Sequence, residues 1–160
     1  MSLKIFQAKD LDISELQIVN DGVMGGKSQG FVEKVEDGLR FYGEVSLANN
    51  GGFSSFRMPF QQIDISAYSK FKIKLKGDGK SYQFRVQEKP DQKHNYVVDI
   101  PTDQKEQEIQ IDFQKMKPQF RGKKLDLPYF KGDDLSRLGF MILPGKAVDF
   151  ELIVQEIILI

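Results

Sequence analysis

Hydrophobic and polar residues alternate along most of this chain, a pattern that predicts β-strands with one buried face. The clearest case is the segment 39–47, where apolar residues and Gly43 take the odd positions and mainly polar residues take the even ones. Five further segments alternate in the same way: 71–75, 82–86, 96–100, 109–113 and 150–154. Turn-forming sequences, such as Gly-Asp-Gly at 77–79, lie between them. Many short strands without intervening helices predict an all-β fold, either a sandwich or a barrel.

Helical segments are expected to be few and short. No stretch of ten or more residues repeats apolar positions at the 3.6-residue spacing of an amphipathic helix. We expect short helical turns at 64–69 and 133–138 only. The apolar run 157–160 closes the chain and predicts a core strand, although it also suits a strand that seals an interface.

Composition predicts one domain. The 160 residues are 40% apolar and contain no long linker rich in proline, glycine or serine, so we expect a single domain over 1–160. A chain of this length buries about 68–70% of its unfolded surface, which is enough for a core without crosslinks. The chain has no cysteine, which excludes disulfides, thiol catalysis and thiolate metal sites.

The charge balance excludes one class of partner. The 23 basic and 23 acidic residues cancel, so the chain lacks the field of one sign that nucleic-acid binding usually requires, and we expect no nucleic-acid partner. One local cluster remains, because Lys70, Lys72, Lys74 and Lys76 would share one face of a strand. A solvated outer face or protection of a sheet edge explains this lysine stripe better than a polyanion site does.

The location of the protein is expected to be cytoplasmic. No apolar run approaches the ~20 residues of a membrane span, and the N-terminus lacks the basic and apolar regions of a signal peptide. We therefore expect no membrane span. The opening residues Met1, Ser2 and Leu3 resemble a cloning remnant, which leaves open a native targeting segment that was trimmed.

Two glycine-rich segments are the most distinctive feature of the sequence. Residues 20–28 read Asn-Asp-Gly-Val-Met-Gly-Gly-Lys-Ser, and residues 49–57 read Asn-Asn-Gly-Gly-Phe-Ser-Ser-Phe-Arg. Glycine pairs beside Asn and Asp are typical of loops that need a positive φ or a close approach to the backbone. The first segment resembles a phosphate-binding loop, but it is one residue short and has Asp21 where that loop has its first glycine. Both segments therefore predict shaped loop surfaces rather than a nucleotide site.

These two segments and five others resemble, in order, the conserved blocks of the complex I intermediate-associated protein 30 family. The other five are 41–47, 77–82, 120–122, 138–141 and 150–152. The resemblance implies a jelly-roll β-sandwich of the galactose-binding-domain-like type. Mitochondrial members act as assembly chaperones for respiratory complex I, and plant relatives carry the module fused to nucleotide-binding domains. The resemblance therefore implies a non-catalytic module that recognises a protein partner, whose identity stays open.

Candidate catalytic chemistry is sparse, and we expect no enzyme. His94 is the only histidine and lies in a polar loop without a nucleophile motif, so no catalytic triad is indicated. Zinc sites need clusters of His and Cys, and no pair of carboxylates stands out for glycoside hydrolysis. Residues 10–14 alternate oxygen-bearing side chains but do not follow an EF-hand. We expect no cofactor, and a structural Ca²⁺ held by loop carbonyls stays open.

The polar residues best suited to a ligand or partner site belong to the glycine-rich segments and one alternating strand: Asp21, Asn49, Asn50, Arg57, Gln83 and Arg85. The last two would lie on the face opposite the apolar residues of 82–86. The planar donor fork of arginine suits a carboxylate, a phosphate or vicinal hydroxyls. The alternative is an architectural network, with Asp21 paired to Arg57 and the asparagines capping loop amides.

A saccharide is the second candidate ligand, by analogy of fold. The chain has no tryptophan, and Tyr42, Tyr82 and Tyr96 are the stacking platforms that it offers instead, although ordinary sheet packing explains these tyrosines better. An exposed apolar patch beside the glycine loops would favour protein recognition. A concave groove lined by Tyr, Arg and Asn would favour a small ligand.

Overall fold

Thirteen strands make up most of the described part of the computed structural model, which covers residues 1–21, 26–48 and 52–160. In chain order they are β1 (Leu3–Gln7), β2 (Gln17–Asn20), β3 (Gln29–Val35), β4 (Gly38–Val45), β5 (Ser54–Asp64), β6 (Lys70–Lys76), β7 (Ser81–Gln87), β8 (Asn95–Pro101), β9 (Glu106–Asp112), β10 (Lys117–Phe120), β11 (Lys123–Lys124), β12 (Asp134–Ile142) and β13 (Val148–Leu159). The short 3-10 helices are η1 (Ala8–Asp10), η2 (Ile13–Glu15) and η5 (Phe113–Lys115).

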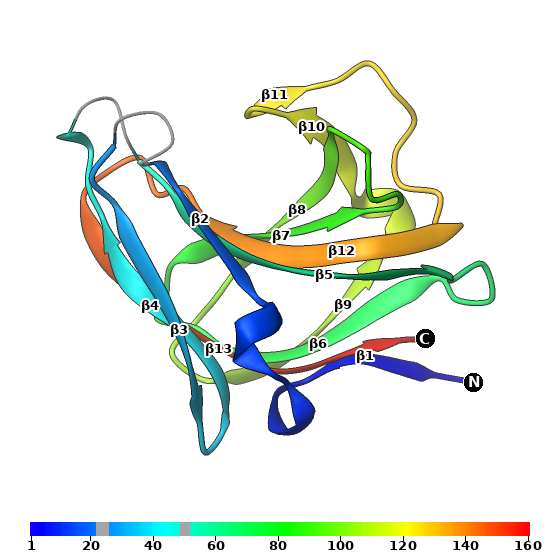
Figure 1. Ribbon diagram of the computed structural model, residues 1–160, viewed down its shortest axis with the longest axis horizontal. Coiled ribbons are helices and arrows are strands. Elements are labelled where there is room, and N and C mark those ends of the chain that lie inside the picture. The colour runs from blue at the N-terminus through cyan, green and yellow to red at the C-terminus, as the bar shows by residue number, and fades with distance from the viewer. Residues whose placement is uncertain (22–25, 49–51) are drawn as a thin grey trace.

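The strands form two antiparallel sheets that pack face to face (Figure 1). The six-stranded sheet has the order β3-β4-β13-β6-β9, and β1 also pairs with β13. The seven-stranded sheet has the order β11-β10-β8-β7-β12-β5-β2. The all-β class and the jelly-roll sandwich are confirmed, and the barrel alternative is wrong.

Alternation along the strands explains how the two sheets meet. Every second residue of β6 and β7 is buried between the sheets, as the period-two pattern predicts. Phe71 of β6 lies at the centre of this core, with its ring centroid 5.0 Å from that of Phe84 in the opposite sheet and 4.9 Å from that of Phe113. Phe130 lies 5.1 Å from Phe113 and closes the cluster. Burial of such large apolar side chains is the main term that stabilises the sandwich.

The segment 133–138 contributes to a strand, so the helical turn expected there is wrong. It belongs mostly to β12, whose ladder with β5 is irregular between Leu135 and Arg137. Because of this irregularity Leu135 and Leu138 both face the core, with exposed fractions of 0% and 1%. Two buried leucines three residues apart mimic the spacing of a helix.

Two smaller local predictions are confirmed. After β5 ends at Asp64, a turn follows in which the amide of Tyr68 donates a hydrogen bond of 3.0 Å to the carbonyl of Ile65. The closing run is a core strand, since Ile157 and Leu159 are fully buried in β13. That strand pairs with β1, β4 and β6.

The lysine stripe of β6 lies on the outer face of the six-stranded sheet, and three of its four lysines are paired with acidic residues of neighbouring strands. The ion pairs join Lys70 to Asp112 (3.6 Å), Lys72 to Glu108 (3.8 Å) and Lys74 to Glu156 (3.4 Å). The solvated-face interpretation is therefore confirmed. Edge protection is wrong, because β6 lies between β13 and β9.

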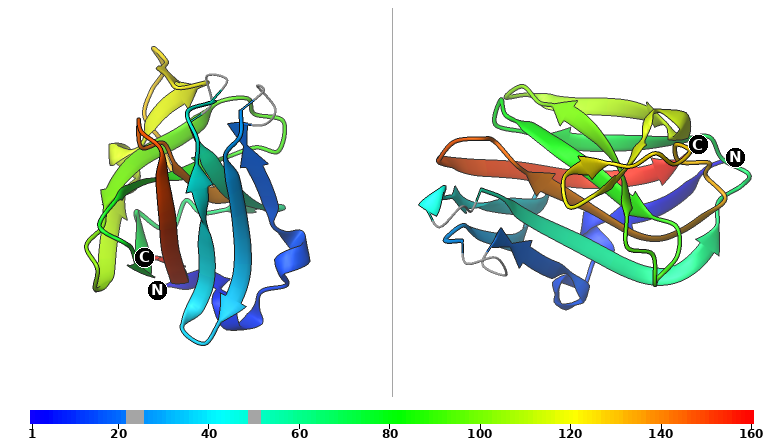
Figure 2. Two further views of the ribbon diagram at one scale, coloured as in Figure 1. Left: turned by 90° about the vertical axis from the view of Figure 1, so that its left-hand side faces the viewer. Right: turned by 90° about the horizontal axis from the view of Figure 1, so that it is seen from above.

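The sandwich has two distinct ends. Both termini lie at one end, where β1 runs beside the last residues of β13 (Figures 1 and 2). The end of β2 and the start of β5 lie at the other (Figure 1). Between the two ends the seven-stranded sheet is curved, and its β10–β11 side rises away from the six-stranded sheet, which makes its outer face concave.

Candidate functional site

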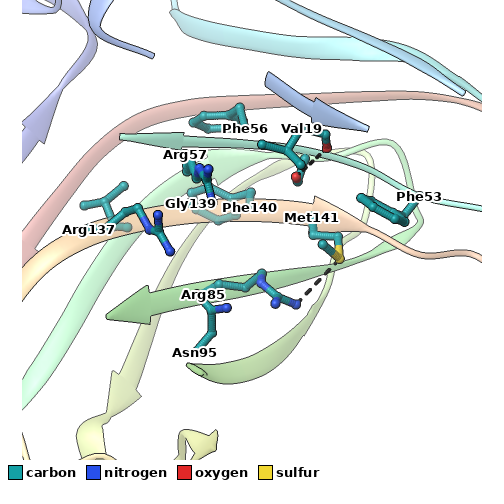
Figure 3. Close-up of a pocket in the computed structure, with 12 residues that line it drawn as sticks. Val19, Phe53, Phe56, Arg57, Arg85, Asn95, Arg137, Gly139, Phe140 and Met141 are labelled. Atoms are coloured by element: carbon teal, nitrogen blue, oxygen red, sulfur yellow. Dashed lines mark hydrogen bonds between the residues drawn. The ribbon is translucent and has the colours of Figure 1, made fainter. Parts of the chain in front are cut away.

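Three arginines surround one glycine on the outer face of the seven-stranded sheet. Gly139 of β12 is the register partner of Arg57 on β5 and, on its other side, of Arg85 on β7. Arg137 lies two residues before Gly139 on β12 and therefore points to the same face. Figure 3 shows the three arginines around Gly139. Three of the five arginines in the chain thus meet at one place.

This place is a depression of about 170 Å³, which we call the arginine hollow. Its lining includes Arg57, Arg85, Arg137, Asn95, Phe53 and Met141, with Gly139 among them (Figure 3). A Cβ added at Gly139 would collide with the carbonyl oxygen of Phe56 and lie 3.0 Å from the Cα of Arg57. The absence of a side chain there therefore keeps the centre of the hollow open. Its volume is below the roughly 300–1,000 Å³ of pockets for drug-sized ligands, so it suits one ring or one charged group.

Neutral side chains hold two of the guanidinium groups in place. Arg57 Nε donates a hydrogen bond of 2.8 Å to Gln17 Oε1, and Arg85 Nη1 donates one of 2.8 Å to Gln83 Oε1. Arg85 Nη1 also lies 3.5 Å from Met141 Sδ. In the described part of the chain, no carboxylate oxygen lies within 4.0 Å of any of the three guanidinium groups.

The cations of the hollow are electrostatically unfavourable in the free protein. Burial away from water lowers the pKa of Arg85 to about 10. Burial and then the positive charges of Arg57 and Arg85 lower the pKa of Arg137 to about 10. Both groups stay charged at neutral pH, which lies well below these values. The hollow is therefore a cluster of half-buried positive charges that no described carboxylate compensates.

Asp21 has the architectural role that the sequence offered as the alternative to a binding role, because it ties the described parts of the two glycine loops together. Its carboxylate accepts hydrogen bonds from the Ser28 amide (3.0 Å), the Ser28 hydroxyl, the Gly52 amide (2.6 Å) and the Phe53 amide (3.2 Å). Burial acts to raise the pKa of Asp21, but these hydrogen bonds outweigh it and bring the pKa below its usual value. A Cβ on Gly26 would collide with this carboxylate, so the loop needs glycine there.

The predicted site residues divide into three groups. Arg57 and Arg85 converge on the hollow, and Gln83 lies beside them through its hydrogen bond to Arg85. Asp21 belongs to a loop network, as the architectural alternative has it, but it pairs with loop donors and Arg57 pairs with Gln17, so the Asp21–Arg57 pair of that alternative is wrong. Asn49 and Asn50 lie outside the described residues.

Sequence reasoning missed Arg137 and Asn95. Arg137 was not predicted as a site residue because the surrounding segment was expected to be helical. The alternation of Leu138, Phe140 and Ile142, which is typical of a strand, is the signal that could have identified it. Asn95 opens β8 and carries no motif that distinguishes it from other loop asparagines. Only the register of the strands brings it to the hollow.

The tyrosines expected as stacking platforms do not line the hollow. Tyr82 and Tyr96 are core residues with exposed fractions of 1% and 9%, so sheet packing is confirmed for both. Tyr42 lies on β4 of the six-stranded sheet, with Arg40 Cζ 3.7 Å from its ring centroid and Phe31 at 5.6 Å. The aromatic residues that line the hollow are phenylalanines: the half-buried Phe53 and the core residues Phe56 and Phe140.

Among the residues with described positions, no group of three or more His, Cys, Asp or Glu side chains could hold a metal ion. The same residues include no helix that is long and apolar enough to cross a membrane.

The fold is similar to that of solved carbohydrate-binding modules. A family 11 module from Clostridium thermocellum, solved in complex with a β-1,3-1,4-mixed-linked tetrasaccharide, matches with a TM-score of 0.71 and 16% identity over 99% of this chain and 95% of that one. The family 11 module of a cellulosomal cellulase of the same organism matches with a TM-score of 0.73 and 15% identity, covering 100% and 94%. A variant of a family 29 module matches with a TM-score of 0.57 and 9% identity, covering 100% and 91%.

These identities are low enough that the likeness concerns the fold alone. A search of curated proteins found no match. A family model does match, and it covers residues 5–154. The chain therefore belongs to the family described as complex I intermediate-associated protein 30, CIA30.

Proposed function

We propose that this chain is a non-catalytic binding module that recognises a saccharide in the arginine hollow. The observation that carries the proposal is the meeting of Arg57, Arg85 and Arg137 with Asn95 around the open centre at Gly139. Guanidinium and amide groups offer several hydrogen-bond donors in fixed directions, which suits the vicinal hydroxyls of a sugar. A concave site rather than a flat surface is typical of a small-ligand module, and the hollow has the Arg and Asn expected of such a groove, although none of its described lining residues is Tyr.

The similarity of fold supports the same class of ligand. The family 11 module that was solved with a tetrasaccharide shares this sandwich over nearly the whole of both chains. The present chain has Phe53 in the hollow rather than a tyrosine. Contacts to a sugar would therefore be mainly polar.

The composition of the hollow supports a module without catalysis. None of the described residues that line it is Asp, Glu or His. Glycoside hydrolysis by the usual mechanism needs two carboxyl groups on either side of the scissile bond. A sugar held in the hollow would meet donors and apolar surface but no acid or base.

Recognition of a protein partner, of the assembly-factor kind that the family name implies, is the second candidate. Exposed leucines at the end of the sandwich where β2 ends and β5 begins favour recognition of a protein. Leu47 is 47% exposed, and a Cβ added at Gly52 would lie 3.5 Å from its Cδ2. Leu143, in the loop before β13, is 53% exposed.

Electrophoresis through native gels that contain soluble polysaccharides tests the proposal. We expect at least one polysaccharide to retard the protein and Arg85→Gln to abolish the retardation. Arg121→Gln is the matched control, because Arg121 belongs to the exposed β10–β11 turn and does not line the hollow. If no polysaccharide retards the protein, or if Arg85→Gln leaves the retardation intact, the proposal is wrong.

A further inference from the structure

Among the described residues, the arginine hollow has no acidic partner, unlike the paired cations on the outer face of the six-stranded sheet. Three of the four lysines in the stripe of β6 are paired with acidic residues of neighbouring strands. Arg40, on the outer face of the same six-stranded sheet, lies 2.9 Å from Glu33 and 2.7 Å from Glu151. Arg57, Arg85 and Arg137 have no such pair among the described residues, although the chain has as many acidic as basic residues.

Three guanidinium groups in one half-buried hollow repel one another. Desolvation weakens each charge's interaction with water, and the low dielectric of a partly buried site strengthens the repulsion. Within a single protein such a cluster is normally compensated by nearby carboxylates. Among the described residues no carboxylate compensates this hollow, and a bound anion would do so.

The spacing leaves room for that anion. Arg57 and Arg85 are two strands apart, which corresponds to about 9–10 Å between their backbones. Gly139 occupies the position between them and presents no side chain. Arg137 adds a third donor fork two residues along β12, and it has no hydrogen bond to another described side chain.

On the basis of the proposed saccharide-binding function, we propose that the hollow selects an acidic sugar and that Arg57, Arg85 and Arg137 hold the carboxylate of a uronic acid residue above Gly139. The planar fork of arginine matches the two oxygens of a carboxylate, so that one guanidinium can donate two parallel hydrogen bonds. Asn95, which lines the same hollow, can donate to or accept from a ring hydroxyl.

Isothermal titration with two matched sets of oligosaccharides tests this inference. One set contains oligomers of galacturonic or glucuronic acid, and the other contains neutral hexose oligomers of equal length. We expect the acidic set to bind at least tenfold more tightly at about 0.1 M salt, and to lose affinity at higher salt. Arg137→Gln should weaken the acidic set by about 10- to 100-fold and the neutral set by a clearly smaller factor, because a hydrogen bond to a carboxylate is charge-assisted and stronger than one to a neutral hydroxyl.

Two further variants make the result specific to the hollow. Arg137→Lys keeps the charge but loses the fork, so it should recover only part of the affinity. Arg121→Gln removes an exposed cation outside the hollow and should change little. Thermal unfolding of each variant shows that a loss of binding is not a loss of fold.

The titrations distinguish a failure of the acidic selectivity from a failure of the saccharide-binding function. Equal binding of acidic and neutral oligomers, with both sensitive to Arg85→Gln, would overturn the acidic selectivity and leave the saccharide function intact. Tighter binding of sulfated or phosphorylated sugars than of uronic acids would overturn the carboxylate assignment. Binding of no saccharide at all would overturn both, and binding of an acidic peptide instead would support the second candidate function.

Discussion

Arg57 and Arg85 stand on either side of Gly139 in one cross-strand row of the seven-stranded sheet, and both line the same hollow. Within the described chain neither forms an ion pair. A family member with a carbohydrate-binding-module fold therefore presents concentrated positive charge on its concave face. This charge is the physical basis of the function that we propose.

Replacing Arg137 should stabilise the free protein. Arg137→Gln removes a charge that two other arginines repel and that has no carboxylate partner, so we expect the free energy of unfolding to rise by about 0.5–1 kcal/mol. Arg40→Gln is the opposite case, because it breaks two ion pairs and should lower stability by up to about 1 kcal/mol. Urea denaturation of both variants checks the signs, and a clear loss of stability in Arg137→Gln would show that the arginines are compensated.

Asp21→Asn should destabilise the fold through the glycine loops. The amide leaves at least one of the four hydrogen bonds to Asp21 without an acceptor and removes the charge from the others, so we expect a loss of about 2 kcal/mol at about pH 7. Asp126→Asn changes an exposed carboxylate without such bonds and is the control. Equal stabilities of the two variants would contradict the role assigned to Asp21.

The contribution of Asp21 should depend on pH in a defined direction. Its pKa is lowered in the folded state, so its stabilisation is present in full above the unfolded value of about 3.9 and is lost as the pH falls through the lower folded value. The difference in stability between the protein and Asp21→Asn should therefore shrink below about pH 4. Denaturation curves at a series of acidic pH values measure it, and a difference that stays constant would contradict the assignment.

Much of the fold was predictable from local sequence, because strands of a sandwich bury every second residue. The pattern fails where a ladder is irregular, since the irregularity of β12 near Leu135 and Leu138 shifts the phase of burial. The site was predictable only in part. Arg57 and Arg85 stand out as arginines in alternating or glycine-flanked segments, but their meeting depends on the order of β5, β12 and β7, which no local pattern encodes.

Filling the centre of the hollow should affect both stability and binding. In Gly139→Ala the added methyl collides with the carbonyl oxygen of Phe56, and we expect a loss of about 1–3 kcal/mol, as for other overpacked sites. Gly139 also lines the hollow between its register partners Arg57 and Arg85, so we expect the added methyl to lower saccharide affinity even where the variant is fully folded. Circular dichroism and titration below the melting transition separate the two effects, and unchanged affinity would mean that the ligand does not lie over Gly139.

The aromatic core should carry much of the stability. Phe71→Ala removes a fully buried ring that contacts Phe84, Phe113 and Phe130, and we expect a loss of about 3–5 kcal/mol. Phe31→Ala truncates a phenylalanine that is 48% exposed on β3 and should lose less than about 1 kcal/mol. Equilibrium denaturation compares the two, and similar losses would contradict the placement of the core.

The most direct test of saccharide recognition in the arginine hollow follows the guanidinium Nε–H resonances of the protein in a proton–nitrogen spectrum during titration with uronic acid oligomers. We predict saturable shifts of Arg57, Arg85 and Arg137 and of the Gly139 amide, while Arg40 and Arg121 stay unchanged. Saturable shifts confined to residues outside the hollow, or no shifts at ligand concentrations that saturate the acidic set in calorimetry, would contradict the proposed site.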